Sequence, residues 1–244
     1  MRRASVFLAR LPQGFRRAAC ASVSAIALGG ALAFGGGGFS GAHAEAASGS
    51  GAAQIVESAT GISFPLHMGS LTATGAGCRY KYGFAKVYAV ALFVDAHAAK
   101  KTGASPDDTL AAVLAGGIPS AVSIKLARSV GSRDLSDALS DAIAQRIKAR
   151  AERDSADAGA DLAALAALGT ALTTTPLGAT LPLGTEIIFT RKTGGLEVFV
   201  NGKSTGVFSS PRLEWAFYDT YLGDAPVVPA ARAAFKAGIE AMRK

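Results

Sequence analysis

Three short apolar segments separated by two turn dipeptides constrain the fold of this chain more than any other feature. Residues 186–191, 196–200 and 204–208 are rich in β-branched and aromatic side chains, which favour strands. Gly194-Gly195 and Asn201-Gly202 separate these segments, and both dipeptides are typical of tight hairpin turns. The sequence therefore predicts a three-stranded antiparallel meander in this part of the chain.

More strands are predicted upstream of the meander. Residues 62–65 form a short extended segment, and residues 70–79 predict a thin strand whose small residues would let another group approach its backbone. Residues 84–94 predict a strand that is covered on both faces, and residues 80–83 would connect it to the preceding strand. Residues 121–130 alternate apolar and polar side chains, which predicts a strand with one buried face.

Helices are predicted on either side of the meander. Ser132 is the expected N-cap of the first helix, whose apolar stripe repeats every fourth residue, at Leu135, Leu139, Ile143 and Ile147. A second helix is expected over residues 156–168 and would end at Gly169. A third begins at Pro211 and is closed by Gly223, and the last covers about residues 229–242.

This order of elements predicts the fold class. Paired strands, a further strand, two helices, a meander and two more helices follow one another, and no internal repeat is visible. Such an order indicates an α+β fold in which helices pack on one face of an antiparallel sheet.

The N-terminal residues 1–44 predict a cleavable targeting segment. They contain five arginines and no acidic residue, and residues 18–39 are small and apolar. Ala42-His43-Ala44 then provides an A-x-A cleavage site. The alternative is a single transmembrane anchor, which the many glycines of the apolar stretch disfavour. Residues 45–58 are expected to be a flexible linker to a domain over residues 59–244.

The length of this segment suggests targeting in two steps, with import into an organelle followed by further sorting. We expect a plastid location, in the stroma or the thylakoid lumen, with the bacterial periplasm or the mitochondrion as alternatives. No stable membrane span is expected in the mature chain.

The charge of the chain belongs mostly to this segment. The net charge is +7, yet the sequence beyond residue 44 holds 20 basic and 18 acidic residues, so we expect no nucleic-acid partner. Beyond the leader there is one cysteine, Cys78, and the histidines are scattered. The sequence therefore predicts no metal site and no cofactor.

Four stretches, taken in order, resemble proteins of the chalcone isomerase-like superfamily. They are residues 75–79 (GAGCR), 84–94 (FAKVYAVALFV), 195–208 and 221–229 (YLGDAPVVP). The resemblance covers about residues 60–243. It implies an open-faced β-sandwich, in which a large antiparallel sheet carries a layer of helices on one face, with a ligand cleft between the sheet and the helices.

The resemblance also implies two ligand-binding residues. Arg79 matches an arginine that faces a phenolate or carboxylate in the cleft, and a guanidinium suits that role because its planar fork pairs with a carboxylate. Tyr88 matches the tyrosine that joins this arginine in the fatty-acid-binding branch. The catalytic isomerases have a threonine at the matching position. Lys125 and Arg128 could also face the cleft.

The chain departs from the catalytic branch of the superfamily. Isomerases have a Tyr and an Asn on the first helix of the helical layer, and Leu135 and Ala142 align with them. Residues 131–145 contain neither Tyr nor Asn, so no catalytic residue is expected.

Three functions remain open from the sequence. The favoured one is a non-catalytic protein that binds a fatty acid or similar small apolar carboxylate, with the head group at Arg79 and Tyr88. The alternatives are an intramolecular lyase of chalcone isomerase type acting on a flavonoid-like phenol, and a structural or accessory domain with a closed cleft.

Overall fold

The computed structural model describes residues 53–102 and 105–244 of the chain. The predicted targeting segment, residues 1–44, lies outside the described residues, as do residues 45–52 of the predicted linker. Within the described residues, no helix is long and apolar enough to span a membrane.

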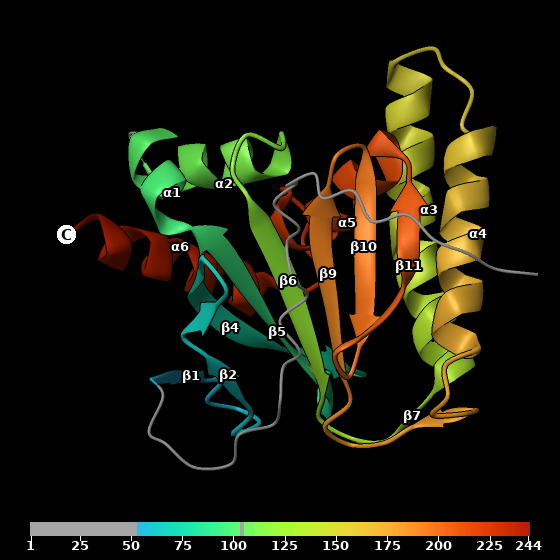
Figure 1. Cartoon of the computed structure of the whole chain (residues 1–244), viewed down its shortest axis with the longest axis horizontal. Helices are drawn as coiled ribbons and strands as arrows, with labels where there is room; N and C mark the ends of the chain where they lie inside the picture. Colours follow the sequence, from blue (N-terminus) through green and yellow to red (C-terminus); the bar gives the residue numbers. More distant parts are fainter. Residues whose placement is uncertain (1–52, 103–104) are drawn as a thin grey trace, which may run out of the picture. The chain divides into compact units, whose positions relative to one another are not determined.

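A single antiparallel sheet of seven strands forms the centre of the described domain (Figure 1). Its strand order is β11-β10-β9-β6-β5-β4-β3. The strands are β3 (His67–Met68), β4 (Leu71–Lys81), β5 (Ala85–Asp95), β6 (Ser120–Leu126), β9 (Glu186–Lys192), β10 (Gly195–Val200) and β11 (Lys203–Ser209). The predicted meander is confirmed as β9, β10 and β11, and the predicted α+β, open-faced architecture is confirmed with it.

Two short strand pairs lie outside this sheet. β1 (Gln54–Val56) pairs with β2 (Ser63–Pro65), and β7 (Val130–Gly131) pairs with β8 (Thr180–Leu181). The prediction of a linker over residues 45–58 is wrong at its C-terminal end, because β1 is an ordered strand. Its backbone groups are satisfied by pairing with β2, which a local reading of small residues does not reveal.

The helices of the described residues are α1 (Ala96–Thr102), α2 (Pro106–Leu114), α3 (Ser132–Arg153), α4 (Gly159–Thr173), α5 (Pro211–Leu222) and α6 (Pro229–Arg243). The last four correspond to the predicted helices, whereas α1 and α2 were not predicted. α2 begins with a capping box: the Ser105 hydroxyl accepts from the backbone N–H of Asp108, and the Asp108 carboxylate accepts from the backbone N–H of Ser105.

Two predicted helix ends are wrong. The N-cap of α3 is Gly131, and Ser132 is the first helical residue, whose hydroxyl donates to the Ala179 carbonyl at 3.2 Å. Gly169 lies inside α4 and does not end it. A Cβ at Gly169 would come within 3.0 Å of the Ser136 hydroxyl on α3, so this glycine serves the close packing of two helices.

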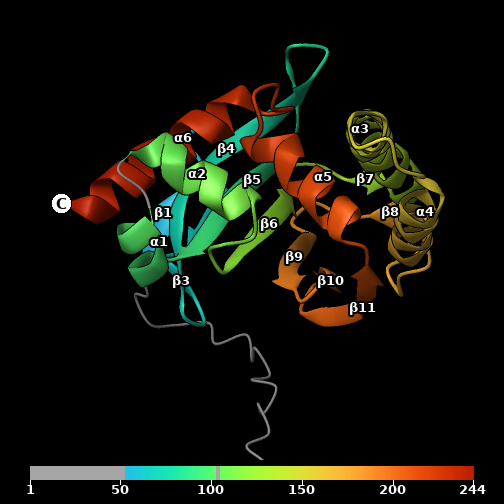
Figure 2. The same ribbon diagram turned by 90° about the horizontal axis from the view of Figure 1, so that it is seen from above.

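Both faces of the sheet are covered at its centre. The larger core lies between the sheet and the helices, and Figure 2 shows α2, α5 and α6 along this face. A smaller cluster lies on the opposite face, where Phe64 of β2 packs over Phe93 and small residues of β4, β5 and β6. Ser123 of β6 is fully buried there, so the prediction that β6 has one exposed face is wrong at this residue.

Glycines on both elements, which have no side chain, let α6 lie directly on β4. A Cβ at Gly75 would come within 2.6 Å of the Ala234 carbonyl oxygen, and one at Gly77 would overlap the backbone of Ala231. From the helix side, a Cβ at Gly238 would overlap the Thr74 carbonyl oxygen. The predicted thin strand is therefore confirmed, and its glycines determine how closely the last helix approaches the sheet.

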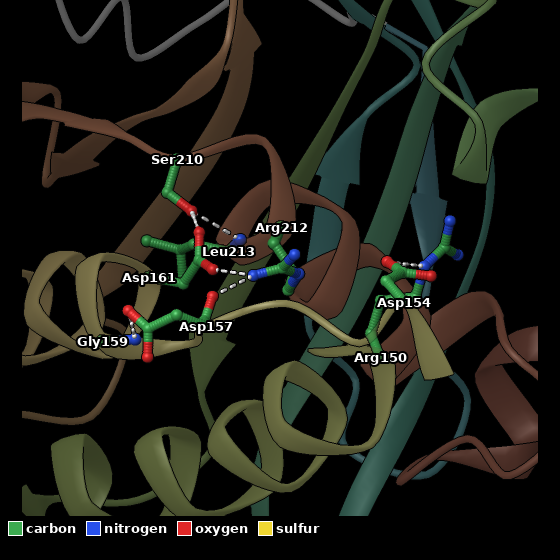
Figure 3. A network of polar contacts seen from close by, with 8 residues as sticks. All are labelled: Arg150, Asp154, Asp157, Gly159, Asp161, Ser210, Arg212 and Leu213. Atoms are coloured by element: carbon green, nitrogen blue, oxygen red, sulfur yellow. Dashed lines mark hydrogen bonds and ion pairs between the residues drawn. The ribbon is translucent and has the colours of Figure 1, made fainter. Parts of the chain in front are cut away.

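A polar network fixes the start of α5 against α4 (Figure 3). The Ser210 hydroxyl accepts from the backbone N–H of Leu213 at 2.9 Å and donates to Asp161 at 2.6 Å. Arg212 pairs with the same carboxylate and donates to the Asp157 carbonyl at 3.0 Å. These contacts tie the N-terminal end of α5 to the start of α4.

Candidate ligand-binding cavity

A cavity of about 200 Å³ lies between the outer ends of β4 and β5 and the helical layer. Its apolar wall comes mainly from α3, and its polar groups come from β4, β5 and the starts and ends of the helices. The lining residues are Arg79, Lys81, Val87, Tyr88, Val130, Asp134, Leu135, Ala138, Leu139, Ala142, Thr220 and Val227. The lining is therefore mostly apolar. Arg79, Lys81 and Tyr88 form its polar side on the sheet, and Asp134 and Thr220 add polar groups from the helices.

The structure brings Arg79 and Tyr88 together on the wall of this cavity. They are cross-strand partners in the register of β4 and β5, so their side chains leave the same face of the sheet. The Arg79 side chain is exposed, and its guanidinium donates to the Val227 carbonyl at 3.1 Å. Arg79 therefore lies at the rim, held by the segment that leads into α6.

Tyr88 lies deeper in the cavity wall and is 6% exposed. Its hydroxyl is 3.3 Å from the hydroxyl of Tyr221, a fully buried residue near the end of α5. Burial raises the pKa of both phenols, and that of Tyr221 well above its usual value, which the neighbouring Tyr88 raises further. Both hydroxyls therefore keep their protons and can donate hydrogen bonds across the physiological pH range.

The positive charges of two arginines influence the pKa of Tyr221. Arg79 and Arg146 both lower the pKa of Tyr221, but by less than burial raises it. Arg146 of α3 pairs with Asp219 at 3.0 Å and donates to the Ala225 carbonyl at 2.7 Å, which ties α3 to α5 and to the link before α6. Of the charged groups that line the cavity, Arg79 and Lys81 are positive and Asp134 of α3 is negative.

Sequence reasoning did not single out Tyr221 or Arg146. Tyr221 does begin the stretch of residues 221–229 that supports the family resemblance, and this was the available signal. Its hydrogen-bond partner is 133 positions away in the chain, so only the tertiary structure reveals the contact.

Leu135 and Ala142 line the cavity, at the two positions that align with the Tyr and Asn of isomerases. Lys125, by contrast, faces the other side of the sheet, where it donates to the Ser63 carbonyl at 3.0 Å and lies over the Phe64 ring. Arg128 is exposed and does not line the cavity. The expectation that these two cations could face the cleft is therefore wrong, since alternation along β6 directs Lys125 to the opposite face.

The described residues contain no cluster of three or more His, Cys, Asp or Glu side chains that could hold a metal ion. The cavity lining therefore offers the guanidinium of Arg79, the ammonium of Lys81, the carboxylate of Asp134, the hydroxyls of Tyr88 and Thr220, and an apolar wall, with Tyr221 behind Tyr88.

The sequence model of the chalcone isomerase-like family matches residues 54–238. The chain belongs to this family. This chalcone isomerase-like chain also has the fold of a fatty-acid binding protein from Arabidopsis thaliana, AtFAP1, whose crystal structure superposes with a TM-score of 0.66. The two sequences are 20% identical, and the likeness covers 78% of this chain and 99% of that chain. No curated protein sequence matches the chain.

Proposed function

We propose that this protein binds a fatty acid or a similar small apolar carboxylate in the cavity between sheet and helices, without transforming it. The observation that carries this proposal is the pairing of Arg79 with Tyr88 on the wall of a cavity that is otherwise mostly apolar. The fold likeness to a fatty-acid binding protein supports the same choice.

The apolar wall accounts for the affinity of the tail. Each buried methylene contributes about 0.8 kcal/mol, so a chain of six to eight would contribute several kcal/mol before the costs of association are deducted. The cavity volume of about 200 Å³ lies below the range of roughly 300–1,000 Å³ that is common for ligand pockets. A short or medium chain therefore suits the cavity as it stands, and a longer tail requires side chains of α3 to move.

The polar side accounts for the acid head. A carboxylate buried without a partner would cost more than the tail gains, so it needs charge and hydrogen bonds. Arg79 offers the charge and two parallel N–H donors. Tyr88 lines the cavity and Tyr221 lies behind it, so when Tyr221 donates to Tyr88, the hydroxyl hydrogen of Tyr88 remains for a ligand.

The proposal that the protein does not transform its ligand rests on two positions of α3. Leu135 and Ala142 carry no group that could polarise an enone or move a proton. Positioned donors or general acids each contribute about two to four orders of magnitude in rate, and neither of these two positions supplies one.

Native mass spectrometry of the purified protein, followed by extraction and identification of bound acids, tests the proposal. We expect acyl chains to co-purify, or added octanoic and dodecanoic acid to bind. Ala142→Phe is the matched control, because it adds a ring to the apolar wall of the cavity and leaves the side chains of Arg79 and Tyr88 in the sequence. No acid bound to the wild type, or equal binding to Ala142→Phe, would contradict the proposed site.

We also propose that residues 1–44 direct the chain to a plastid, in the stroma or thylakoid lumen, or in other settings to the periplasm or mitochondrion, and are removed near Ala44. The basic, then apolar composition before an A-x-A site supports this. N-terminal sequencing of the protein from its source would show a first residue close to Glu45. A mature protein that still begins near Met1 would contradict it.

A further inference from the structure

The tip of the β4–β5 hairpin presents aromatic side chains to solvent. Tyr82 and Phe84 are each 77% exposed, the highest values among the large apolar side chains of the described residues. Tyr80, just before them, is 36% exposed. Figure 2 shows this hairpin extending beyond the neighbouring ribbon. An apolar group of this size on a projecting loop points to an interaction surface.

The backbone conformation at the tip of the hairpin disfavours the aromatic residue that occupies it. Tyr82 has a φ of 57° and Gly83 a φ of 80°, so both occupy the left-handed region. Glycine and asparagine adopt this region easily, whereas a bulky residue such as tyrosine does so only at a cost. The chain thus retains a large ring where the turn disfavours one, and strain of this kind marks functional segments.

The charged residues of the hairpin segment itself are all positive. Residues 79–86 contain Arg79, Lys81 and Lys86 and no acidic residue. The Lys81 ammonium lies 5.2 Å from the centre of the Tyr82 ring, and Lys86 donates to the Ala59 carbonyl at the base of the hairpin. Rings that sit at the headgroup level, flanked by lysine and arginine, match the chemistry of an anionic membrane surface.

The tip is also next to the cavity. Arg79 and Lys81 belong both to the hairpin and to the lining of the cavity. A surface that contacts the tip would therefore lie at the cavity rim.

We propose that residues 80–84 dock on an anionic phospholipid bilayer, with the rings of Tyr82 and Phe84 at the headgroup level and Lys81 against the lipid phosphates. Where the proposed function holds, docking places the cavity rim at the membrane from which an acyl chain enters. The docking itself does not depend on that function.

A fluorescence experiment on the full chain tests the docking locally, so that membrane binding by residues 1–44 does not confuse the readout. Phe84→Trp places a reporter at the tip, and Val207→Trp, at a 53% exposed position on the opposite edge strand β11, is the matched control. Each is compared with the wild type, whose single tryptophan is Trp215. Vesicles contain phosphatidylcholine alone or an equimolar mixture with phosphatidylglycerol, with brominated acyl chains as quencher.

We expect the anionic vesicles to quench the added fluorescence of Phe84→Trp at least several-fold more than that of Val207→Trp, with little effect from neutral vesicles. Adding Lys81→Glu to Phe84→Trp should weaken the vesicle affinity about tenfold, because it reverses one charge at the surface. Equal quenching of the two reporters, or none in Phe84→Trp, would overturn the proposal. If the vesicles do not quench Phe84→Trp at all, the partner of the exposed rings would be a protein and not a membrane.

A solution assay separates this proposal from the proposed function. Tyr82→Ser/Phe84→Ser should bind a medium-chain acid as the wild type does when vesicles are absent, because neither ring lines the cavity. The same variant should take up the acid from anionic vesicles several-fold more slowly. Acid uptake from vesicles at the wild-type rate would count against docking as the route of delivery, whereas loss of acid binding in every protein would contradict the proposed function alone.

Discussion

Arg79 and Tyr88 stand directly opposite each other on β4 and β5, and they differ sharply in exposure. The guanidinium is at the solvent-exposed rim, whereas the phenol is buried and bonded to a second phenol on α5. The polar side of the cavity therefore runs from a charged rim to neutral donors inside. This order suits an anion that keeps some contact with solvent while its tail is buried.

Removing the buried donor tests the inner part of this arrangement. Tyr88→Phe keeps the ring and its packing but leaves the Tyr221 hydroxyl as the remaining phenol, so acid binding should weaken by about 1 kcal/mol. Isothermal titration with dodecanoic acid measures the change. Affinity equal to the wild type would mean that the phenol pair is structural and does not contact the head group.

The buried phenols also predict how the stability of the fold depends on pH. The pKa values of Tyr88, Tyr218 and Tyr221 are raised by burial, so each folded-state pKa lies above the unfolded value of about 10. Below about pH 10 their contribution to stability is fully present. As the pH rises above this value, the unfolded state loses protons first and the free energy of unfolding falls.

Urea unfolding between neutral pH and about pH 11 measures this dependence. Tyr221→Phe should reduce the loss of stability at high pH, whereas Tyr82→Phe, which removes an exposed hydroxyl, should leave it unchanged. A wild type whose stability is constant above pH 10 would contradict the burial of the three phenols.

Chalcone cyclisation should be no faster with this protein than without it. Leu135 and Ala142 stand where a donor and a polarising group would be needed. Incubation with a chalcone and chiral analysis of the flavanone formed provides the measurement. Rapid conversion to one enantiomer would show that other side chains of the cavity perform the reaction.

Gly238 should be intolerant of even one added carbon. Alanine is favoured over glycine inside a helix by about 1 kcal/mol, yet a Cβ here would overlap the Thr74 carbonyl oxygen. Gly238→Ala should therefore lower the free energy of unfolding by about 2–3 kcal/mol, because α6 must move away from β4. Ala233→Ser, at an exposed position on the same helix, should change it by less than about 0.5 kcal/mol. A stabilised Gly238→Ala would contradict the close contact.

The strands were predictable because their signals are local. Turn dipeptides such as Asn201-Gly202 and the dense apolar run of β5 determine structure over a few residues, and the structure confirms both. α2 was missed although Ser105 and Asp108 form a capping box, because its apolar stripe is short. Gly169 was read as a helix end by the same local rule that works for Gly223, and only packing against α3 distinguishes the two.

The cavity was predictable only in part. The resemblance pointed to Arg79 and Tyr88, and the structure brings them to one wall. It could not reveal that Arg79 is exposed and bonded to Val227, nor that Tyr221 completes a phenol pair, since both contacts join segments more than a hundred residues apart. Side-chain direction on β6, which turns Lys125 away from the cavity, likewise depends on register with distant strands.

The central claim is that Arg79 binds the carboxylate of the ligand. Titration of dodecanoic acid and of dodecanol into the wild type and Arg79→Ala separates charge from burial, because the two ligands share one tail. We expect Arg79→Ala to weaken acid binding by about 1–2 kcal/mol, a value moderated by the exposure of the side chain, and to leave alcohol binding within about 0.3 kcal/mol. Equal losses for acid and alcohol would show that Arg79 is structural and that the head group lies elsewhere.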